Sequence, residues 1–104
     1  MANNKGIIYK WTNKINGLSY IGQTTNPEKR YREHLRRKDN TYFHNALGKY
    51  GEDNFTYEVL ESNIDSSKLD EREIYWISYY DSYNNGYNLT IGGGTTRGFK
   101  FSEK

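Results

Sequence analysis

The chain has no cysteine, a single proline among its 104 residues, and no apolar run of the length that a membrane span needs. The absence of cysteine excludes disulfide bonds and thiolate metal sites. The N-terminus also lacks the apolar segment of a secretory signal. We therefore expect one intracellular, cytoplasmic domain with a modest core and no membrane association.

Hydrophobic residues make up only 34% of the chain, but 11 tyrosines and 2 tryptophans are present. Aromatic rings must therefore supply much of the buried area, and several tyrosine hydroxyls will need hydrogen-bond partners.

Charge is divided unevenly along the chain. Residues 1–50 carry ten lysines and arginines against three acidic residues, whereas residues 51–96 carry two against nine. This asymmetry could place a basic surface against a polyanion such as DNA, or it could be a solvated helix face, and charge alone favours neither. The candidate DNA-binding residues are Lys29, Arg30, Arg32, Arg36, Arg37 and Lys38.

A β-hairpin is predicted near the start, with strands over residues 7–12 and 18–23. Asn16-Gly17 between them predicts a two-residue turn, which would pair Tyr9 with Thr24. Because strand faces alternate, Tyr9 and Tyr20 would then lie on one face, whereas a three-residue loop would separate them. The two tyrosines are either ordinary core residues or hydroxyls that share a cleft.

Three helices and one more strand are predicted after the hairpin. Asn26-Pro27 begins the first helix, and Gly51 ends the second. The helices should run from Pro27 to about Lys38, from Thr41 to Tyr50 and from near Ser67 to near Tyr83, with a strand over 55–61 and a short extended segment over 87–91.

Glu73 lies within the apolar stripe predicted for the third helix, beside Trp76 and Ile77. An unpaired carboxylate in such a stripe would be costly to bury. Glu73 either forms a structural ion pair or reaches water at the rim, or it serves as a metal ligand or a general acid or base. The pattern alone does not decide between these.

Arg30 and His34 are i,i+4 neighbours on the first helix. They are either surface residues or a pair that faces a phosphate, with Arg30 binding its oxygens and His34 exchanging protons near neutral pH. His44 lies off the apolar stripe of the second helix and is expected at the surface.

The order of these residues resembles the GIY-YIG nuclease domain, above all the nuclease modules of phage and intron-encoded homing endonucleases. The resemblance covers roughly residues 6–91. It is carried by Gly6-Ile7-Ile8-Tyr9, Tyr20-Ile21-Gly22, Arg30, His34, Gly48-Lys49-Tyr50-Gly51, Glu73 and Gly86-Tyr87-Asn88.

The resemblance implies an α+β fold, with a small three-stranded antiparallel sheet flanked by helices, that cleaves double-stranded DNA in a phage or bacterial host cell. It implies one divalent cation, Mg²⁺ or Mn²⁺, bound by Glu73, and no small-molecule cofactor. Residues 1–91 would be the nuclease domain, monomeric in isolation. The Gly-rich tail, 92–104, resembles the start of a following DNA-binding region.

The resemblance also implies a role for each matched residue. Tyr9 would accept a proton from the attacking water, and Arg30 would stabilise charge on the phosphate. Tyr20 and His34 would position or shuttle protons, and Asn88 would support the site. Since tyrosine has a pKa of about 10, nearby cations must lower the pKa of Tyr9, or Tyr9 only orients the water.

Two positions depart from the family pattern. Leu18 stands where several relatives carry lysine, and Lys10 is the nearest substitute. A histidine that some relatives carry near the start of the second helix is matched only by Asn40 or His44. These departures leave two alternatives to a nuclease: a DNA-binding module that does not cleave, and an interaction domain whose tyrosines are all core.

Overall fold

The computed structural model describes residues 5–36 and 41–92. No helix within these residues is both long and apolar enough to cross a membrane. The elements in chain order are β1 (Lys5–Asn13), β2 (Ser19–Thr24), α1 (Pro27–Arg36), α2 (Tyr42–Tyr50), η1 (Glu52–Asn54), β3 (Phe55–Asp65), η2 (Ser66–Lys68) and α3 (Leu69–Tyr80).

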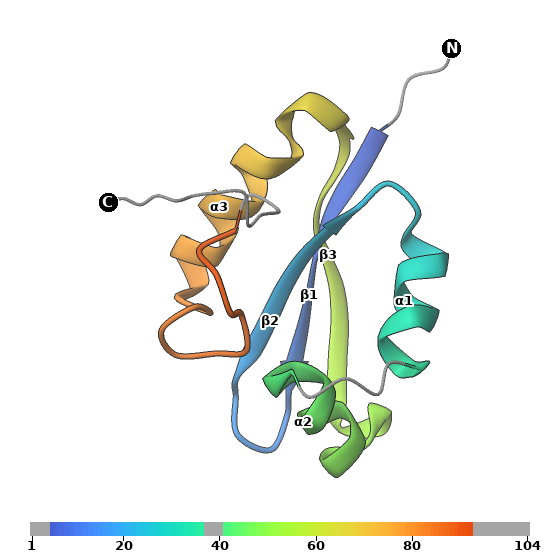
Figure 1. The fold of residues 1–104 in the computed structure, drawn as a ribbon, viewed down its shortest axis with the longest axis vertical. Coiled ribbons are helices and arrows are strands. Elements are labelled where there is room, and N and C mark those ends of the chain that lie inside the picture. Colours follow the sequence, from blue (N-terminus) through green and yellow to red (C-terminus); the bar gives the residue numbers. More distant parts are fainter. Residues whose placement is uncertain (1–4, 37–40, 93–104) are drawn as a thin grey trace.

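The three strands form one antiparallel sheet in the order β2-β1-β3, so β2 and β3 are its two edges. Helices α3 and α1 lie on opposite sides of this sheet, and α2 lies near the hairpin end of the strands (Figure 1). The predicted α+β fold is confirmed.

The hairpin has a longer loop than Asn16-Gly17 predicts. Tyr9 pairs with Gly22, and the N–H of Asn13 bonds to the carbonyl of Leu18 at 2.9 Å, which leaves four residues in the loop. The predicted two-residue turn is therefore wrong. The side chain of Asn16 accepts the N–H of Leu18 at 2.9 Å and bends the chain locally. Because the shift is even, Tyr9 and Tyr20 stay on one face.

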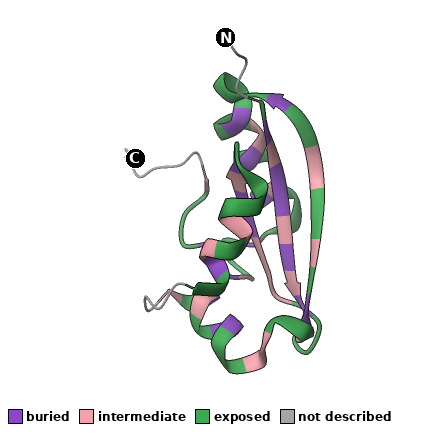
Figure 2. Ribbon diagram, turned by 90° about the vertical axis from the view of Figure 1, so that its right-hand side faces the viewer, coloured by how far each residue is buried: buried purple, intermediate pink, exposed green. Residues whose placement is uncertain are grey.

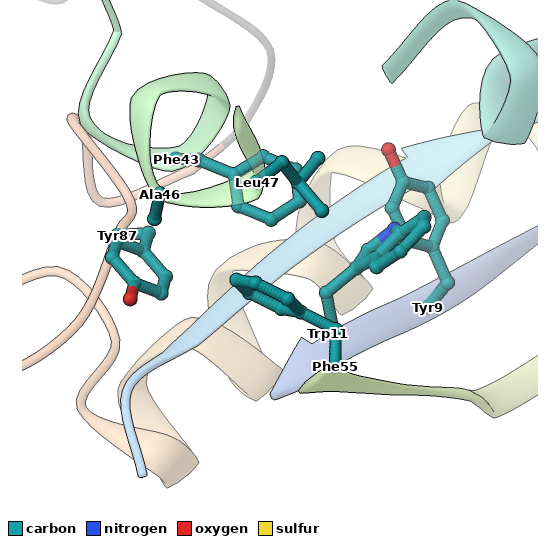
Figure 3. Packing of buried hydrophobic residues seen from close by; sticks show 7 residues of the cluster. All are labelled: Tyr9, Trp11, Phe43, Ala46, Leu47, Phe55 and Tyr87. Carbon is teal, nitrogen blue, oxygen red and sulfur yellow. The ribbon is translucent and has the colours of Figure 1, made fainter. Parts of the chain in front are cut away.

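Each face of the sheet has its own buried cluster, and buried residues gather where the helices meet the strands (Figure 2). Toward α3, the cluster contains Ile8, Ile21, Ile64, Leu69 and Ile77. Toward α1 and α2 it is largely aromatic, and Figure 3 shows its seven residues, Tyr9, Trp11, Phe43, Ala46, Leu47, Phe55 and Tyr87.

The first two helices begin as their sequences predict. The side chain of Asn26 accepts the N–H of Lys29 at 3.3 Å, and the side chain of Thr41 accepts the N–H of His44 at 3.3 Å. On α1, His34 is buried and Leu35 is 41% exposed, so the imidazole and not the leucine side chain packs into the core.

Three further boundaries differ from the prediction. Strand β3 continues to Asp65, and Val59 is 49% exposed at this sheet edge. Helix α3 ends at Tyr80, because Asp81 takes a left-handed conformation with φ 55°. Residues 87–91 form no strand. The predictions for Arg37, Lys38 and Asn40, and for the tail beyond Gly92, lie outside the described residues.

Candidate active site at the free edge of β2

A pocket of about 580 Å³ runs beside the free edge of β2. Since no strand within residues 5–36 and 41–92 covers this edge, residues from both faces of the sheet reach the pocket. The lining residues include four predicted site residues, Tyr20, Arg30, Glu73 and Asn88, together with Gln23, Thr24, Thr25, Thr41, Phe43, His44, Leu69, Tyr87, Leu89 and Thr90.

Glu73 enters the pocket from α3 and is 8% exposed. Its Oε1 accepts a hydrogen bond from Nε2 of Gln23 at 2.9 Å, and the same nitrogen donates to Oδ1 of Asp70 at 2.8 Å. Carboxylate oxygens are the ligands that Mg²⁺ and Mn²⁺ prefer. A buried carboxylate that opens onto a polar pocket therefore fits a divalent cation.

Four side chains from three elements form a continuous chain of hydrogen bonds. The hydroxyl of Tyr9 lies 2.7 Å from Nε2 of His34, and Nδ1 of His34 lies 2.8 Å from Nε2 of His44. Nδ1 of His44 lies 2.8 Å from Oγ1 of Thr41. When both imidazoles are neutral and protonated on Nδ1, each group can donate to the next one along the chain. Tyr9 then donates to His34, His34 to His44, and His44 to Thr41. The arrangement can conduct a proton.

Burial raises the pKa of Tyr9 well above its usual value of 10.0; the neighbouring Tyr20 adds to the shift and Arg30 opposes it. Tyr9 therefore stays protonated at neutral pH, because Arg30 lowers its pKa less than burial raises it. When His34 is protonated on Nδ1, the hydroxyl of Tyr9 donates to Nε2 of His34.

Tyr9 and Tyr20 differ in their access to the pocket. Their rings lie on one face of the sheet with centroids 6.3 Å apart, as predicted. Tyr20 lines the pocket, whereas Tyr9 is 1% exposed and lies behind the pocket wall. The prediction that both hydroxyls share a cleft therefore holds for Tyr20 but not for Tyr9. Gly22 has no side chain, so the Tyr9 ring packs against the backbone of β2 at this position.

Arg30 is half-buried and lines the pocket, and its Nε lies 3.2 Å from Oε1 of Glu33. Lys29, Arg32 and Arg36 are exposed on other sides of α1. Of the six predicted basic residues, the four that the structure describes therefore divide into one pocket residue and three residues on the outer surface of the helix.

Asn88 uses its whole side-chain amide on the backbone of β2. Its Oδ1 accepts the N–H of Ile21 at 2.9 Å, and its Nδ2 donates to the carbonyl of Ile21 at 2.8 Å. Ser82 donates a third bond, to Oδ1 of Asn88, at 2.7 Å. One side chain thereby bonds to the backbone of β2 as a neighbouring strand would, and it fixes the edge of the sheet.

Leu18, which departs from the family pattern, and its nearest substitute, Lys10, both lie outside the pocket lining. Lys10 is engaged between the carboxylate of Glu58, at 3.3 Å, and the ring of Tyr80, at 3.9 Å. Leu18 packs against the aromatic cluster. Lys10 therefore does not substitute for the lysine that several relatives carry at the position of Leu18.

His44 is the residue that the sequence analysis underestimated, because it was expected at the surface. It lines the pocket and bonds to His34. The usable signal was its place one turn into α2, three residues after the capping Thr41, where some relatives carry a histidine.

Comparisons with known proteins agree with this geometry. A probable intron-encoded endonuclease 1 from Neurospora crassa is 32% identical over 111 residues, which cover all of this chain and 36% of that protein. The chain thus spans about a third of the length of this relative.

Two solved structures share the fold. The catalytic domain of the homing endonuclease I-TevI matches with a TM-score of 0.71 and 26% identity, covering 82% of this chain and 98% of that one. A mutant of the same domain, described as that of an intron endonuclease, matches with a TM-score of 0.75 and 26% identity, covering 85% and 96%.

The family model described as the GIY-YIG catalytic domain matches residues 5–88, which contain every residue of the pocket up to Asn88. The resemblance inferred from the sequence motifs is confirmed. By fold, motif order and family match, this chain belongs to the GIY-YIG catalytic domain family.

Proposed function

We propose that the chain is a divalent-cation-dependent endonuclease that hydrolyses phosphodiester bonds of double-stranded DNA, as the catalytic module of a homing endonuclease. The observation that carries this proposal is the convergence of three kinds of group on one pocket. Arg30 supplies positive charge, Glu73 supplies a buried carboxylate, and His44 supplies a link to the hydrogen-bond chain behind it.

Arg30 would bind the scissile phosphate through its planar guanidinium, which matches two phosphate oxygens and stabilises the charge that develops on them. Exposed Lys29, Arg32 and Arg36 on the same helix would contact flanking phosphates and hold the duplex over the pocket. Tyr20 lines the pocket nearby and would orient the phosphate or the attacking water.

Nucleases of this family generally depend on a divalent cation. Glu73 would hold that cation, Mg²⁺ or Mn²⁺, with water completing its coordination. The bound cation would supply a Lewis acid to the phosphate and would lower the pKa of water beside it. Glu73 would bring the charge that keeps the cation in the pocket.

The chain Tyr9–His34–His44–Thr41 would accept the proton of the attacking water. As the water oxygen bonds to phosphorus, its proton would pass by way of the Tyr20 hydroxyl at the pocket wall to the oxygen of Tyr9, and the proton of Tyr9 would pass to Nε2 of His34. The bond from phosphorus to the leaving oxygen would then break, and the leaving oxygen would keep the electron pair and take a proton from solvent. This route needs no free phenolate, which agrees with the raised pKa of Tyr9. Nε2 of His44 would accept a hydrogen bond from Nδ1 of His34 and so stabilise the imidazolium of His34.

Asn88 would act as a positioning residue. Both of its amide atoms are bonded to Ile21, so it has little capacity left for substrate. By fixing the edge of β2, it would hold Tyr20 and Gln23, on either side of Ile21, at the pocket.

Because the chain spans about a third of its fungal relative, target recognition would depend on further protein outside this domain. We propose that residues 92–104 lead into such a region. Residues 1–91 alone would act as a monomer, bind DNA weakly and show little sequence preference.

Supercoiled plasmid tests the proposal directly. With Mg²⁺ the chain should convert plasmid to nicked circles, and neither a chelator control nor Glu73→Ala should do so. Arg30→Ala should slow nicking about 10²-fold, since it removes charge stabilisation in the transition state. DNA binding without any nicking by the parent chain would instead identify a non-cleaving module. An absence of both would identify an interaction domain.

A further inference from the structure

We infer that Asp70 is a second carboxylate of the cation site and that Gln23 is the residue that holds it beside Glu73. The inference rests on the proposed function and deepens it. The observation is the amide nitrogen of Gln23, which donates to Oδ1 of Asp70 at 2.8 Å and to Oε1 of Glu73 at 2.9 Å.

The fold brings these three residues together from two elements. Gln23 pairs with Ile8 across the β1–β2 ladder, and Ile8 belongs to the cluster that packs against α3, so Gln23 projects toward that helix. Asp70 and Glu73 are three residues apart on α3 and therefore share a face of it. The site is thus preformed between the edge strand and the first turns of α3.

The position of the Gln23 nitrogen is electrostatically suited to a cation. Two carboxylates that share one amide donor repel each other. A divalent cation at this position would offset both charges. A turn of the amide about its last side-chain torsion would present its Oε1, an oxygen of the kind hard cations bind.

The two carboxylates differ in their surroundings, which separates their roles. Glu73 is buried and lines the pocket, so it lies where the phosphate would bind. Asp70 is exposed. Asp70 should therefore strengthen cation binding without taking part in the chemical step, and Gln23 should act through both carboxylates as a positioning residue.

Manganese binding to the chain in the absence of DNA tests the inference, with free Mn²⁺ measured by electron paramagnetic resonance. Asp70→Asn keeps the shape and an acceptor for Gln23, and it should weaken Mn²⁺ binding about tenfold. Glu71→Gln removes the same charge from an exposed position one residue away, and it should change binding less than about twofold.

The outcomes separate this inference from the proposed function. If Glu73→Gln loses Mn²⁺ binding while Asp70→Asn binds like the parent, Asp70 is not a ligand and only the inference fails. If Glu73→Gln also binds like the parent, the cation site of the proposed function fails as well. If Asp70→Asn and Glu71→Gln lose the same Mn²⁺ affinity, the loss comes from net charge alone and the inference is overturned.

A second variant tests the role of Gln23 through stability. Gln23→Ala removes the donor between the carboxylates, so its melting temperature without cation should fall below that of the parent. Added Mn²⁺ should then raise the melting temperature of Gln23→Ala more than that of the parent. A cation-free melting temperature equal to that of the parent would show that Gln23 does not hold the carboxylates together.

Discussion

Gly22 lies directly across the β1–β2 ladder from Tyr9, and the ring of Tyr9 fills the space that a side chain at Gly22 would need. A Cβ at this position would overlap the hydroxyl of Tyr9 and come within 3.0 Å of its ring carbon Cε1. The ring is buried on all sides and cannot give way cheaply. Glycine here is therefore required by packing and leaves room for the bond between Tyr9 and His34.

Gly22→Ala should destabilise the domain by about 1–3 kcal/mol, because the added methyl group forces the Tyr9 ring out of place. Nicking should fall with it, since the hydroxyl of Tyr9 would leave His34. Gly48→Ala is the matched control, because nothing lies within 4 Å of a Cβ there and Gly48 is inside α2. That control should be neutral or stabilise by up to about 1 kcal/mol. Equal melting temperatures for Gly22→Ala and the parent would contradict this packing.

Tyr9→Phe should slow nicking about 10²-fold and leave the domain folded, because the ring still packs and only the bond to His34 is lost. His44→Ala should slow nicking by a similar factor. The double variant should be little slower than either single variant, since both belong to one hydrogen-bond chain. Tyr57→Phe, whose ring stacks on Tyr9 outside that chain, should nick like the parent. If the double variant loses the product of the two single rate factors, Tyr9 and His44 act separately.

The outer surface of α1 should supply much of the affinity for DNA. Replacing Lys29, Arg32 and Arg36 by alanine should weaken binding roughly tenfold near 0.1 M salt and reduce the dependence of log affinity on log salt by about 3. Binding can be followed by fluorescence anisotropy of a labelled duplex. A control triple variant at Lys14, Lys49 and Lys68 removes the same charge from other elements. Equal losses in both variants would show that net charge, and not α1, governs binding.

Glu61 offers a test of stability that is separate from the pocket. Its Oε1 accepts bonds from Nε1 of Trp76 at 2.9 Å and Nε of Arg72 at 2.8 Å, which hold the pKa of Glu61 below its usual value of 4.5. A lowered folded-state pKa gives stability that is present above pH 4.5 and is lost as the pH falls through the folded-state pKa.

Glu61→Gln should therefore lower the free energy of unfolding at neutral pH, by at most about 1 kcal/mol because the side chain is a third exposed. The difference from the parent should vanish in acid, which urea unfolding at both pH values would measure. A difference that persists unchanged in acid would show that the charge of Glu61 contributes nothing.

Local patterns predicted the parts of the fold that depend on local chemistry. Asn26 caps α1 as predicted, because its side chain accepts the N–H of Lys29. The face of Tyr9 and Tyr20 was predicted correctly despite the wrong loop, because a shift of two residues preserves strand alternation. Glu73 was identifiable because a carboxylate in an apolar stripe needs a partner.

Contacts between distant segments were not predictable in this way. The periodicity of α2 placed His44 off its own apolar stripe, but could not show that His34 of α1 covers it. Likewise, Gln23 meets Asp70 only because β2 packs against α3, 47 residues along the chain. The short extended segment predicted over 87–91 also could not show that the side chain of Asn88 bonds to both backbone groups of Ile21 at the β2 edge.

The most direct measurement of the central claim is the single-turnover rate of plasmid nicking by Glu73→Gln with saturating Mg²⁺. Glutamine keeps the shape and an acceptor for Gln23, so the variant should melt like the parent and still bind DNA. Its nicking rate should fall on the order of 10³-fold, because the charge that holds the cation is gone. A folded Glu73→Gln variant that nicks at the parent rate would contradict the placement of the catalytic cation at this edge of β2.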